Sequence, residues 1–505
     1  MNDSRTSRAA KGTLTSFLQY SLQLALQAAL APLVLKVAGK ETLGAYAALM
    51  QVIAHLTLVD FGLNTTLMRY LSQAHGIDDN GRKFRDVFIT GRTFLLISNI
   101  IFALLLLLLS YWIGDLLSLS EHVDTQAKWS LYFLAFWAAI RTPLVLYGGG
   151  LIATQNLATF NLILIVSNVV RLVLSLGLVA IGMSLIGLML ANILAELTGL
   201  TIERYYFRKL HPTVHFGWGL PDKALFREMF KFGFQVMLMN VSTRLVFNSD
   251  NIIAGYLYNA STASVYYTTQ IPAFVGIVLI FKLADNGAPA INELFARRNF
   301  PSLHNGYLRL YRYTLLLAIP FCFGILFFNF PLVSLWVGKE QYAGNIMTVA
   351  LAFFTLSSVL SHINATFLYA FGTIRILVIL GFITGIAKIV LSLWLGKIIG
   401  IEGIMVASVI SDIPGFIYIS LITLRSINIS LYQLWHDSII PSLKAGVLPL
   451  CVGLLILISK PVFNLEKFII MAALFLATSF IGTFLWGLFT SEKEKIFAYV
   501  KAWRN

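Results

Sequence analysis

Charged residues are scarce in this 505-residue sequence. Asp, Glu, Lys and Arg together make up 12% of it, whereas 58% of the residues are hydrophobic and the mean hydropathy is +0.79. About a quarter of the residues of a typical soluble protein are charged. The composition therefore excludes a soluble globular protein and predicts a protein that lies within a membrane.

Cysteine is nearly absent, since Cys322 and Cys451 are the only two and both lie in apolar runs. This scarcity excludes a disulfide framework, a CxxC redox pair and a zinc site. No GxxxxGK[ST] phosphate loop occurs, and we expect neither a metal nor another cofactor. The formal net charge of +14 does not indicate nucleic-acid binding, because the Lys and Arg residues lie in short gaps between apolar runs.

Apolar runs long enough to cross a bilayer recur from one end of the chain to the other. We predict an all-α polytopic membrane protein with fourteen transmembrane helices, the first of them an uncleaved span rather than a signal peptide. The predicted spans are residues 14–37, 43–72, 87–114, 129–153, 157–181, 184–206, 229–257, 264–291, 309–334, 345–371, 374–397, 401–425, 438–459 and 467–489.

The positions of the cations predict how these spans are oriented. With both termini cytoplasmic, the inner segments hold 25 Lys and Arg residues and the outer segments hold 7. Cytoplasmic loops carry such an excess, so this orientation is favoured. No loop is long enough for a soluble catalytic domain, which argues against an enzyme.

Parts of the first half of the sequence recur in the second half. RLVLSLGL (171–178) matches KIVLSLWL (388–395) at five of eight positions, and GLMLANILAEL (187–197) matches GIMVASVISDI (403–413) conservatively. The offsets are 217 and 216 residues, and a weaker echo pairs GKETLGAY (39–46) with NASTASVY (259–266). Six helices per repeat give both copies the same orientation, as in transporters whose substrate site lies between two lobes.

The repeat predicts how the chain is divided. We expect an N-lobe of six helices (1–210), a basic cytoplasmic linker (211–228) and a C-lobe of six helices (229–425). Two appended helices and a cytoplasmic tail complete the chain (426–505).

Several charged residues lie deep in the predicted spans, where each costs at least about 2.5 kcal/mol on insertion scales. The deep cations are Arg141, Arg171, Arg244 and Lys388, and the deep acids are Glu196 and Asp412. Four cations against two acids imply an anionic substrate, although all intramembrane charges together balance at five against five. Polar residues share helix faces with three of these cations, as a hydrated cavity requires.

Structural pairing is the alternative interpretation of the same charges. Arg171 with Glu196, and Lys388 with Asp412, would then form salt bridges within each lobe, and Arg141 and Arg244 would lack deep acidic partners. Three residues apart on one helix, Lys282 and Asp285 are expected to pair locally. His55 and His362 are either polar residues satisfied within their spans or proton carriers.

Three segments carry a family resemblance. LVDFGLNTTLMRYLS (58–72), NSDNIIAGYLYNASTASVYY (248–267) and LVSLWVGKEQY (332–342) resemble segments of the polysaccharide transporter and O-antigen flippase family of the multidrug/oligosaccharidyl-lipid/polysaccharide (MOP) superfamily. The turn after residue 257 departs from the family, because Asn259 and Ser264 stand where glycines are common. The resemblance implies two six-helix lobes around an alternating-access cavity and a cargo of polyprenyl-pyrophosphate-linked oligosaccharide.

We therefore expect a flippase of a prokaryotic plasma (inner) membrane that works as a monomer, with other polysaccharide-assembly proteins as possible partners. The deep cations Arg141, Arg171, Arg244 and Lys388 would bind the pyrophosphate. Sugar hydroxyls would bind Asn161, Asn168, Asn240 and Asn248, and the candidates for ion coupling are Asp60, Glu196 and Asp412. The polyprenyl tail would stay in lipid between the lobes. The rival functions are a drug/cation antiporter of the same superfamily and an integral-membrane glycosyltransferase, polymerase or ligase.

Overall fold

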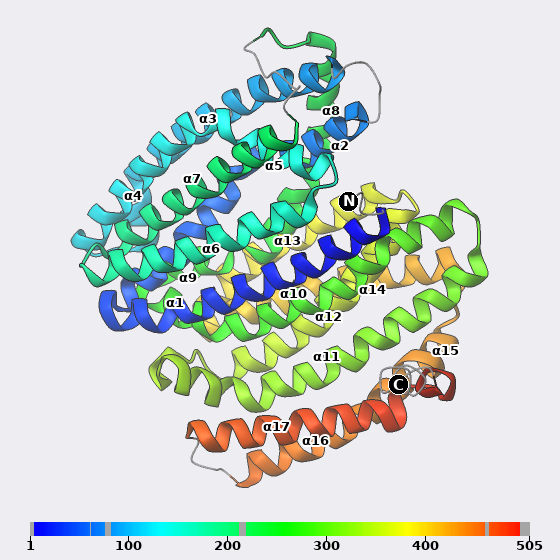
Figure 1. The fold of residues 1–505 in the computed structure, drawn as a ribbon. Helices are drawn as coiled ribbons and strands as arrows, with labels where there is room; N and C mark the ends of the chain where they lie inside the picture. Colours follow the sequence, from blue (N-terminus) through cyan, green and yellow to red (C-terminus); the bar gives the residue numbers. More distant parts are fainter. Residues whose placement is uncertain (1–4, 61, 76–81, 212–218, 460–463, 495–505) are drawn as a thin grey trace, which may run out of the picture. The chain divides into compact units, whose positions relative to one another are not determined.

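The protein is helical throughout the part that the computed structural model describes, which comprises residues 5–60, 62–75, 82–211, 219–459 and 464–494 (Figure 1). The chain divides into two compact units, residues 1–264 and residues 265–505. Parts of the predicted linker (212–218) and of the predicted tail (495–505) lie outside the described residues, as does Phe61 in the segment 58–72.

Unit 1 contains the first nine α-helices and the beginning of the tenth. Two buried apolar clusters hold it together, one around Phe88, Tyr147 and Phe207 and the other around Leu49, Leu106 and Leu131. Its helices are α1 (Arg5–Leu56), the 3-10 turn η1 (Thr57–Asp60), α2 (Leu63–His75), α3 (Arg82–Leu117), α4 (Glu121–Ile140), α5 (Thr142–Ala153), α6 (Leu157–Ala180), α7 (Ser184–Leu210), α8 (Lys223–Phe247) and α9 (Asp250–Leu257).

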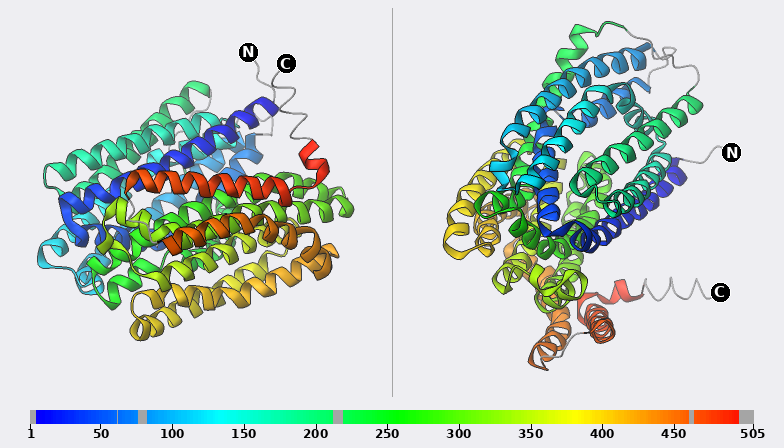
Figure 2. Two further views of the ribbon diagram at one scale, coloured as in Figure 1. Left: turned by 90° about the horizontal axis from the view of Figure 1, so that it is seen from below. Right: turned by 90° about the vertical axis from the view of Figure 1, so that its left-hand side faces the viewer.

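Unit 2 contains the remaining helices. α16 and α17 form a hairpin that packs on α11, and Figure 2 shows this hairpin from two further directions. The helices are α10 (Ala260–Ala296), α11 (Phe300–Val337), η2 (Lys339–Gln341), α12 (Asn345–Ala370), α13 (Ile374–Ile399), α14 (Glu402–Ile427), α15 (Leu431–Leu434), the π-helical turn η3 (Trp435–Ile439), α16 (Ile440–Ser459), α17 (Leu465–Gly482) and a second π-helical turn, η4 (Thr483–Gly487).

The number of membrane-spanning helices differs from the predicted fourteen. Within the described residues, eleven helices are long and apolar enough to cross a membrane, or twelve if the bent pair α4 and α5 forms one span. All fourteen predicted segments are helical, but the first two share α1, whose helical dihedrals are interrupted at Gly39 (φ 83°). The seventh predicted segment divides at Asn248 and Ser249 into α8 and the short α9.

The boundary between the two units lies later than the predicted boundary between the lobes. Contacts of α8 with α2 and α3, and of α9 with α1, assign both helices to unit 1. The oxygen of the Gln51 side chain fastens α9, since it accepts hydrogen bonds from the backbone N–H groups of Asn251 (2.9 Å) and Ile252 (3.3 Å). The division into functional lobes at residue 229 stays a prediction.

A close backbone contact joins the two segments of the weaker sequence echo. Gly44 and Ser264 hold equivalent positions in residues 39–46 and 259–266. A methyl group on Gly44 would lie 1.6 Å from the carbonyl oxygen of Ala260 and 2.9 Å from the backbone nitrogen of Ser264. Only glycine allows helices to approach at this distance, so Gly44 is required by the packing inside unit 1.

Candidate functional site

Arg141 lies at a sharp bend in the membrane-spanning part of unit 1. It ends α4 and precedes α5, and the axes of the two helices differ by 67°. Pro143 explains why a new helix starts here, because proline is favoured in the first turn of a helix and disfavoured inside one. The break places the Arg141 guanidinium beside α3 and α7.

A network of hydrogen bonds surrounds this guanidinium. Arg141 Nη1 lies 2.7 Å from Glu196 Oε1, and Arg141 Nη2 donates to Asn99 Oδ1 at 3.2 Å. The indole N–H of Trp137 donates to the other carboxylate oxygen of Glu196 at 2.7 Å. The side chains of Arg141 and Glu196 retain 22% and 37% exposure, so an anion can reach the guanidinium from the exposed side.

This pairing differs from the structural salt bridge considered above. The predicted pair of Arg171 with Glu196 is wrong, because Glu196 binds Arg141 and Trp137 instead. The statement that Arg141 lacks a deep acidic partner is wrong for the same reason.

Unit 2 contains an equivalent contact. The 216-residue offset that relates Glu196 to Asp412 also relates Arg141 to Ser357. The Ser357 hydroxyl donates a hydrogen bond to Asp412 Oδ2, just as Arg141 donates to Glu196. The repeat is therefore present in side-chain contacts as well as in sequence, and it differs chemically because unit 1 has a cation where unit 2 has a hydroxyl.

Lys388 is enclosed within unit 2. It is 0% exposed, its Nζ lies 5.7 Å from the centre of the Phe354 ring, and it interacts electrostatically with Asp412. Its predicted role in binding pyrophosphate stays a prediction, and that role requires a conformation in which the amine is uncovered.

Arg244 lies near the C-terminal end of α8 and belongs to the same charged region as Arg141. It donates to the carbonyl oxygen of Ala54 and interacts electrostatically with Asp60, which also interacts with Arg141. Asp60 itself accepts a hydrogen bond from the backbone N–H of Gly62 (2.9 Å), so the Asp-x-Gly segment forms a local turn. We call Arg141, Arg244, Asp60 and Glu196 the unit 1 charge cluster.

Arg171 lies on α6, outside this cluster. It is half-buried, and within the described part of the chain it makes no hydrogen bond or salt bridge. Asn168, one turn earlier on α6, is also half-buried and has no side-chain hydrogen bond to a described residue. An uncompensated guanidinium in a membrane-spanning helix is costly, so Arg171 is the cation most available to an anionic ligand.

The other asparagines predicted to bind sugar lie in different surroundings. Asn161 is 4% exposed, and its amide donates to Thr15 Oγ1 (3.1 Å) and Ser16 Oγ (2.8 Å), so it fastens α6 to α1. Asn240 and Asn248 are half-buried on α8 and at its C-terminal cap. A role for any of these side chains in binding sugar stays a prediction.

The sequence interpretation missed three residues that shape this region. Asn99 and Trp137 bind Arg141 and Glu196, and a single polar residue in the long apolar run 94–109 was the available signal for Asn99. Glu203 is 5% exposed and follows Glu196 by two helical turns. A methyl group on Gly148 would lie 2.6 Å from its carboxylate, which explains the small residues of the GGG run on α5.

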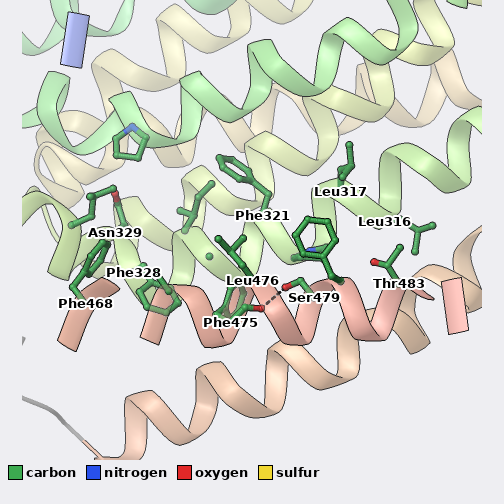
Figure 3. A pocket seen from close by; sticks show the side chains of 17 residues that line it. Leu316, Leu317, Phe321, Phe328, Asn329, Phe468, Phe475, Leu476, Ser479 and Thr483 are labelled. Carbon is green, nitrogen blue, oxygen red and sulfur yellow. Dashed lines mark hydrogen bonds between the residues drawn. The ribbon is translucent and has the colours of Figure 1, made fainter. Parts of the chain in front are cut away.

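An apolar groove in unit 2 is the second feature of interest (Figure 3). It has a volume of about 520 Å³ and lies between α11 and α17, with Pro272 of α10 at one edge. Phe321, Phe328 and Phe475 line it. The hydroxyl of Ser479 donates to the carbonyl of Phe475 (2.7 Å), so this polar group is already satisfied within its own helix.

No group of three or more His, Cys, Asp or Glu side chains that could hold a metal ion occurs among the described residues. Each charge described above therefore pairs with, or is available to, organic or proton ligands.

The sequence and the fold have known relatives. Residues 9–291 match the family described as polysaccharide biosynthesis protein, which is more than half of the chain. The chain belongs to this family. No curated protein sequence matches it. The family match and the fold together identify a multi-pass membrane transporter of polysaccharide biosynthesis in the MOP superfamily.

Two solved structures illustrate the fold. An inward-facing multidrug resistance MATE family transporter of the MOP superfamily is 15% identical, covers 84% of this chain and 99% of its own, and gives a TM-score of 0.69. The lipid II flippase MurJ in an inward closed conformation is 16% identical, covers 94% of this chain and 97% of its own, and gives a TM-score of 0.66.

The covered lengths differ in an informative way. α14 ends at Ile427, after about 85% of the chain. A match that covers 94% must therefore include residues beyond α14, whereas 84% is no more than the preceding helices supply. The likeness to the lipid II flippase thus extends into the C-terminal helices.

Proposed function

We propose that the protein is a flippase that moves a polyprenyl-pyrophosphate-linked oligosaccharide from the cytoplasmic to the outer leaflet of a prokaryotic plasma membrane. The cations of unit 1 carry this proposal. Arg171 is free of protein partners among the described residues, and Arg141 is partly exposed at a helix break. Guanidinium groups bind phosphate oxygens through two parallel hydrogen bonds, which suits a diphosphate.

Binding of the diphosphate requires Arg141 to exchange partners. In this conformation Glu196 occupies one face of the guanidinium at 2.7 Å. A diphosphate carries more negative charge than one carboxylate, so it competes effectively for Arg141, and Trp137 remains to hold Glu196. The pairing thus keeps a buried cation compensated while the cargo is absent.

We further propose that the apolar groove of unit 2 holds part of the polyprenyl tail. Its walls are almost entirely apolar, and it lies on the helices that the likeness to the lipid II flippase includes. A hydrocarbon chain gains from burial in such a groove, whereas a saccharide would lose its hydrogen bonds to water. This position differs from our expectation that the tail stays in lipid between the lobes.

The test of the proposed function compares cells with and without the protein. Without it, polyprenyl-pyrophosphate oligosaccharide should accumulate in the inner leaflet and surface polysaccharide should fall. The Arg171→Ala variant should restore export at least about 10-fold less well than the wild type, because a charge-assisted contact contributes about 1.5–3 kcal/mol. Lipid extraction with mass spectrometry and surface-polysaccharide staining measure the two quantities.

Arg425→Ala is the matched control, since Arg425 is an exposed arginine at the last turn of α14. It should restore export fully, and both variants should reach wild-type abundance in the membrane. Full export by Arg171→Ala would contradict the cation-binding role. Unchanged polysaccharide together with increased susceptibility to cationic drugs would instead favour a drug antiporter, the function of the MATE family transporter that shares the fold.

The groove gives a separate prediction. Ala472 lines it, whereas its neighbour Ala473 is exposed and does not. Ala472→Trp should fill the groove and lower export roughly 10-fold, since loss of about 1.4 kcal/mol of tail binding corresponds to that factor. Ala473→Trp should leave export unchanged in the same surface-polysaccharide assay, and equal losses in both variants would refute the assignment.

A further inference from the structure

A second cluster of charged side chains lies in unit 2, on α10 and α12. Lys282 Nζ lies 2.9 Å from Asp285 Oδ2, which confirms the predicted local pair. His362 Nε2 of α12 lies 2.8 Å from the other carboxylate oxygen, Asp285 Oδ1. Asp285 therefore bridges two basic groups, one of them 77 residues away along the chain.

The imidazole of His362 is held in a defined orientation. The ring of Phe281 stacks on it almost in parallel, with centroids 3.9 Å apart and an angle of 8° between the planes. An aromatic face stabilises a cation placed on it, and so does an adjacent carboxylate. Both neighbours of the ring therefore favour its protonated form.

Water can reach the cluster. The side chains of Lys282 and His362 are each 30% exposed and that of Asp285 is 38% exposed. A charged group facing lipid would be costly, so this exposure indicates a hydrated surface. The ring can therefore exchange a proton with solvent in the present conformation.

The fold does not require these residues. The offset of 220 residues in the weaker echo relates Asp285 to Thr65, and the offset of 216 residues relates His362 to Leu146. The first repeat thus has an uncharged pair of residues at the equivalent positions. A structural requirement common to both repeats does not explain the cluster.

Other charges on neighbouring helices have partners of their own. Glu293, further along α10, binds Arg297 at 2.6 Å. Arg309 and Arg312 of α11 both lie near Glu492, and Asp412 of α14 accepts from Ser357. The charged groups that act on Asp285 are Lys282 and His362.

We propose that Asp285 and His362 form a proton-binding site in unit 2, separate from the unit 1 charge cluster. With Asp285 accepting from Nε2–H, the neutral ring takes up its proton at Nδ1, and the charge of the three residues changes from 0 to +1. The ligand is a proton rather than a metal ion, because two donors and an adjacent ammonium group make a poor metal site. The inference does not depend on the identity of the cargo.

The test is a histidine titration of the full-length protein in detergent, followed by NMR with ¹⁵N-labelled imidazole rings. The sequence has eight histidines, and His362→Gln identifies the signal that belongs to His362. This signal should titrate reversibly between about pH 5 and 8. Asp285→Asn should lower its proton affinity about 10-fold, since it removes the carboxylate and leaves the Lys282 cation, and Lys282→Met should raise it.

The pair His436 and Asp437 supplies a matched control, because the two side chains lie 3.0 Å apart in unit 2 at an exposed position. Asp437→Asn should leave the titration of His362 unchanged. The proposal is overturned if His362 does not titrate between pH 4 and 9, or if Asp285→Asn leaves its midpoint within 0.3 pH unit of the wild type. Because the measurement needs no cargo, its failure is distinguishable from failure of the flippase proposal.

Discussion

Replacement of Arg141 by alanine is expected to lower export of the lipid-linked saccharide at least about 100-fold. The substitution removes a charge-assisted contact to the diphosphate, which contributes about 1.5–3 kcal/mol. It also leaves Glu196, 37% exposed, as an uncompensated negative charge beside the cargo. Repulsion adds to the lost attraction, so the effect should exceed that of Arg171→Ala. Surface-polysaccharide assembly, normalised to protein abundance in the membrane, measures it.

A double substitution separates cargo binding from structural pairing. If Arg141 served only to compensate Glu196, then Glu196→Gln would restore export in the Arg141→Ala background, because no buried charge would remain. If Arg141 binds the diphosphate, the double variant stays inactive although it folds normally. Restored export in the double variant is the result that would sink the assignment of Arg141 to the cargo.

Gly44→Ala is expected to destabilise unit 1 severely. The added methyl group would lie 1.6 Å from the carbonyl oxygen of Ala260, and a backbone atom cannot turn aside as a side chain can. The start of α10 would have to move away from α1, and forced overpacking costs about 1–3 kcal/mol or more. A lower midpoint of thermal unfolding in detergent and a lower abundance in the membrane are the expected measurements.

Gly177→Ala provides the matched control in the same unit. Gly177 lies on α6, and a methyl group there would meet nothing within 4 Å. This substitution should be neutral or stabilising by about 0.5–1 kcal/mol, because alanine favours the helix. Equal stability of the two variants would show that the contact between Gly44 and Ala260 does not constrain the packing.

The helical segments could be predicted from the sequence because hydropathy along a run is a local property. All fourteen predicted segments are helical, and the offsets of the repeat reappear in the contacts of Arg141 with Glu196 and of Ser357 with Asp412. The number of spans could not be obtained in this way. Whether residues 129–153 run straight or bend by 67° depends on how α4 and α5 pack against α3 and α7.

The pairing of the charges was also beyond the sequence. Helical periodicity placed Arg171 on a polar face, but the choice between Arg141 and Arg171 as the partner of Glu196 depends on the rotation of three helices about their axes. The structure brings Arg141 to Glu196 and leaves Arg171 without a partner among the described residues. Likewise, adjacency on one helix predicted Lys282 with Asp285, whereas the contact of His362 with Asp285 joins helices distant in sequence.

The amino-acid sequence by itself determined that this protein lies in a membrane, that its helices repeat and that cations lie deep within them. These properties follow from composition and from short-range periodicity, which every segment carries independently of its neighbours. Only the tertiary structure decided which carboxylate meets which cation, that Lys388 is enclosed and that a groove lies between α11 and α17. Contacts of a few ångströms depend on how the helices pack against one another, and no single segment contains that information.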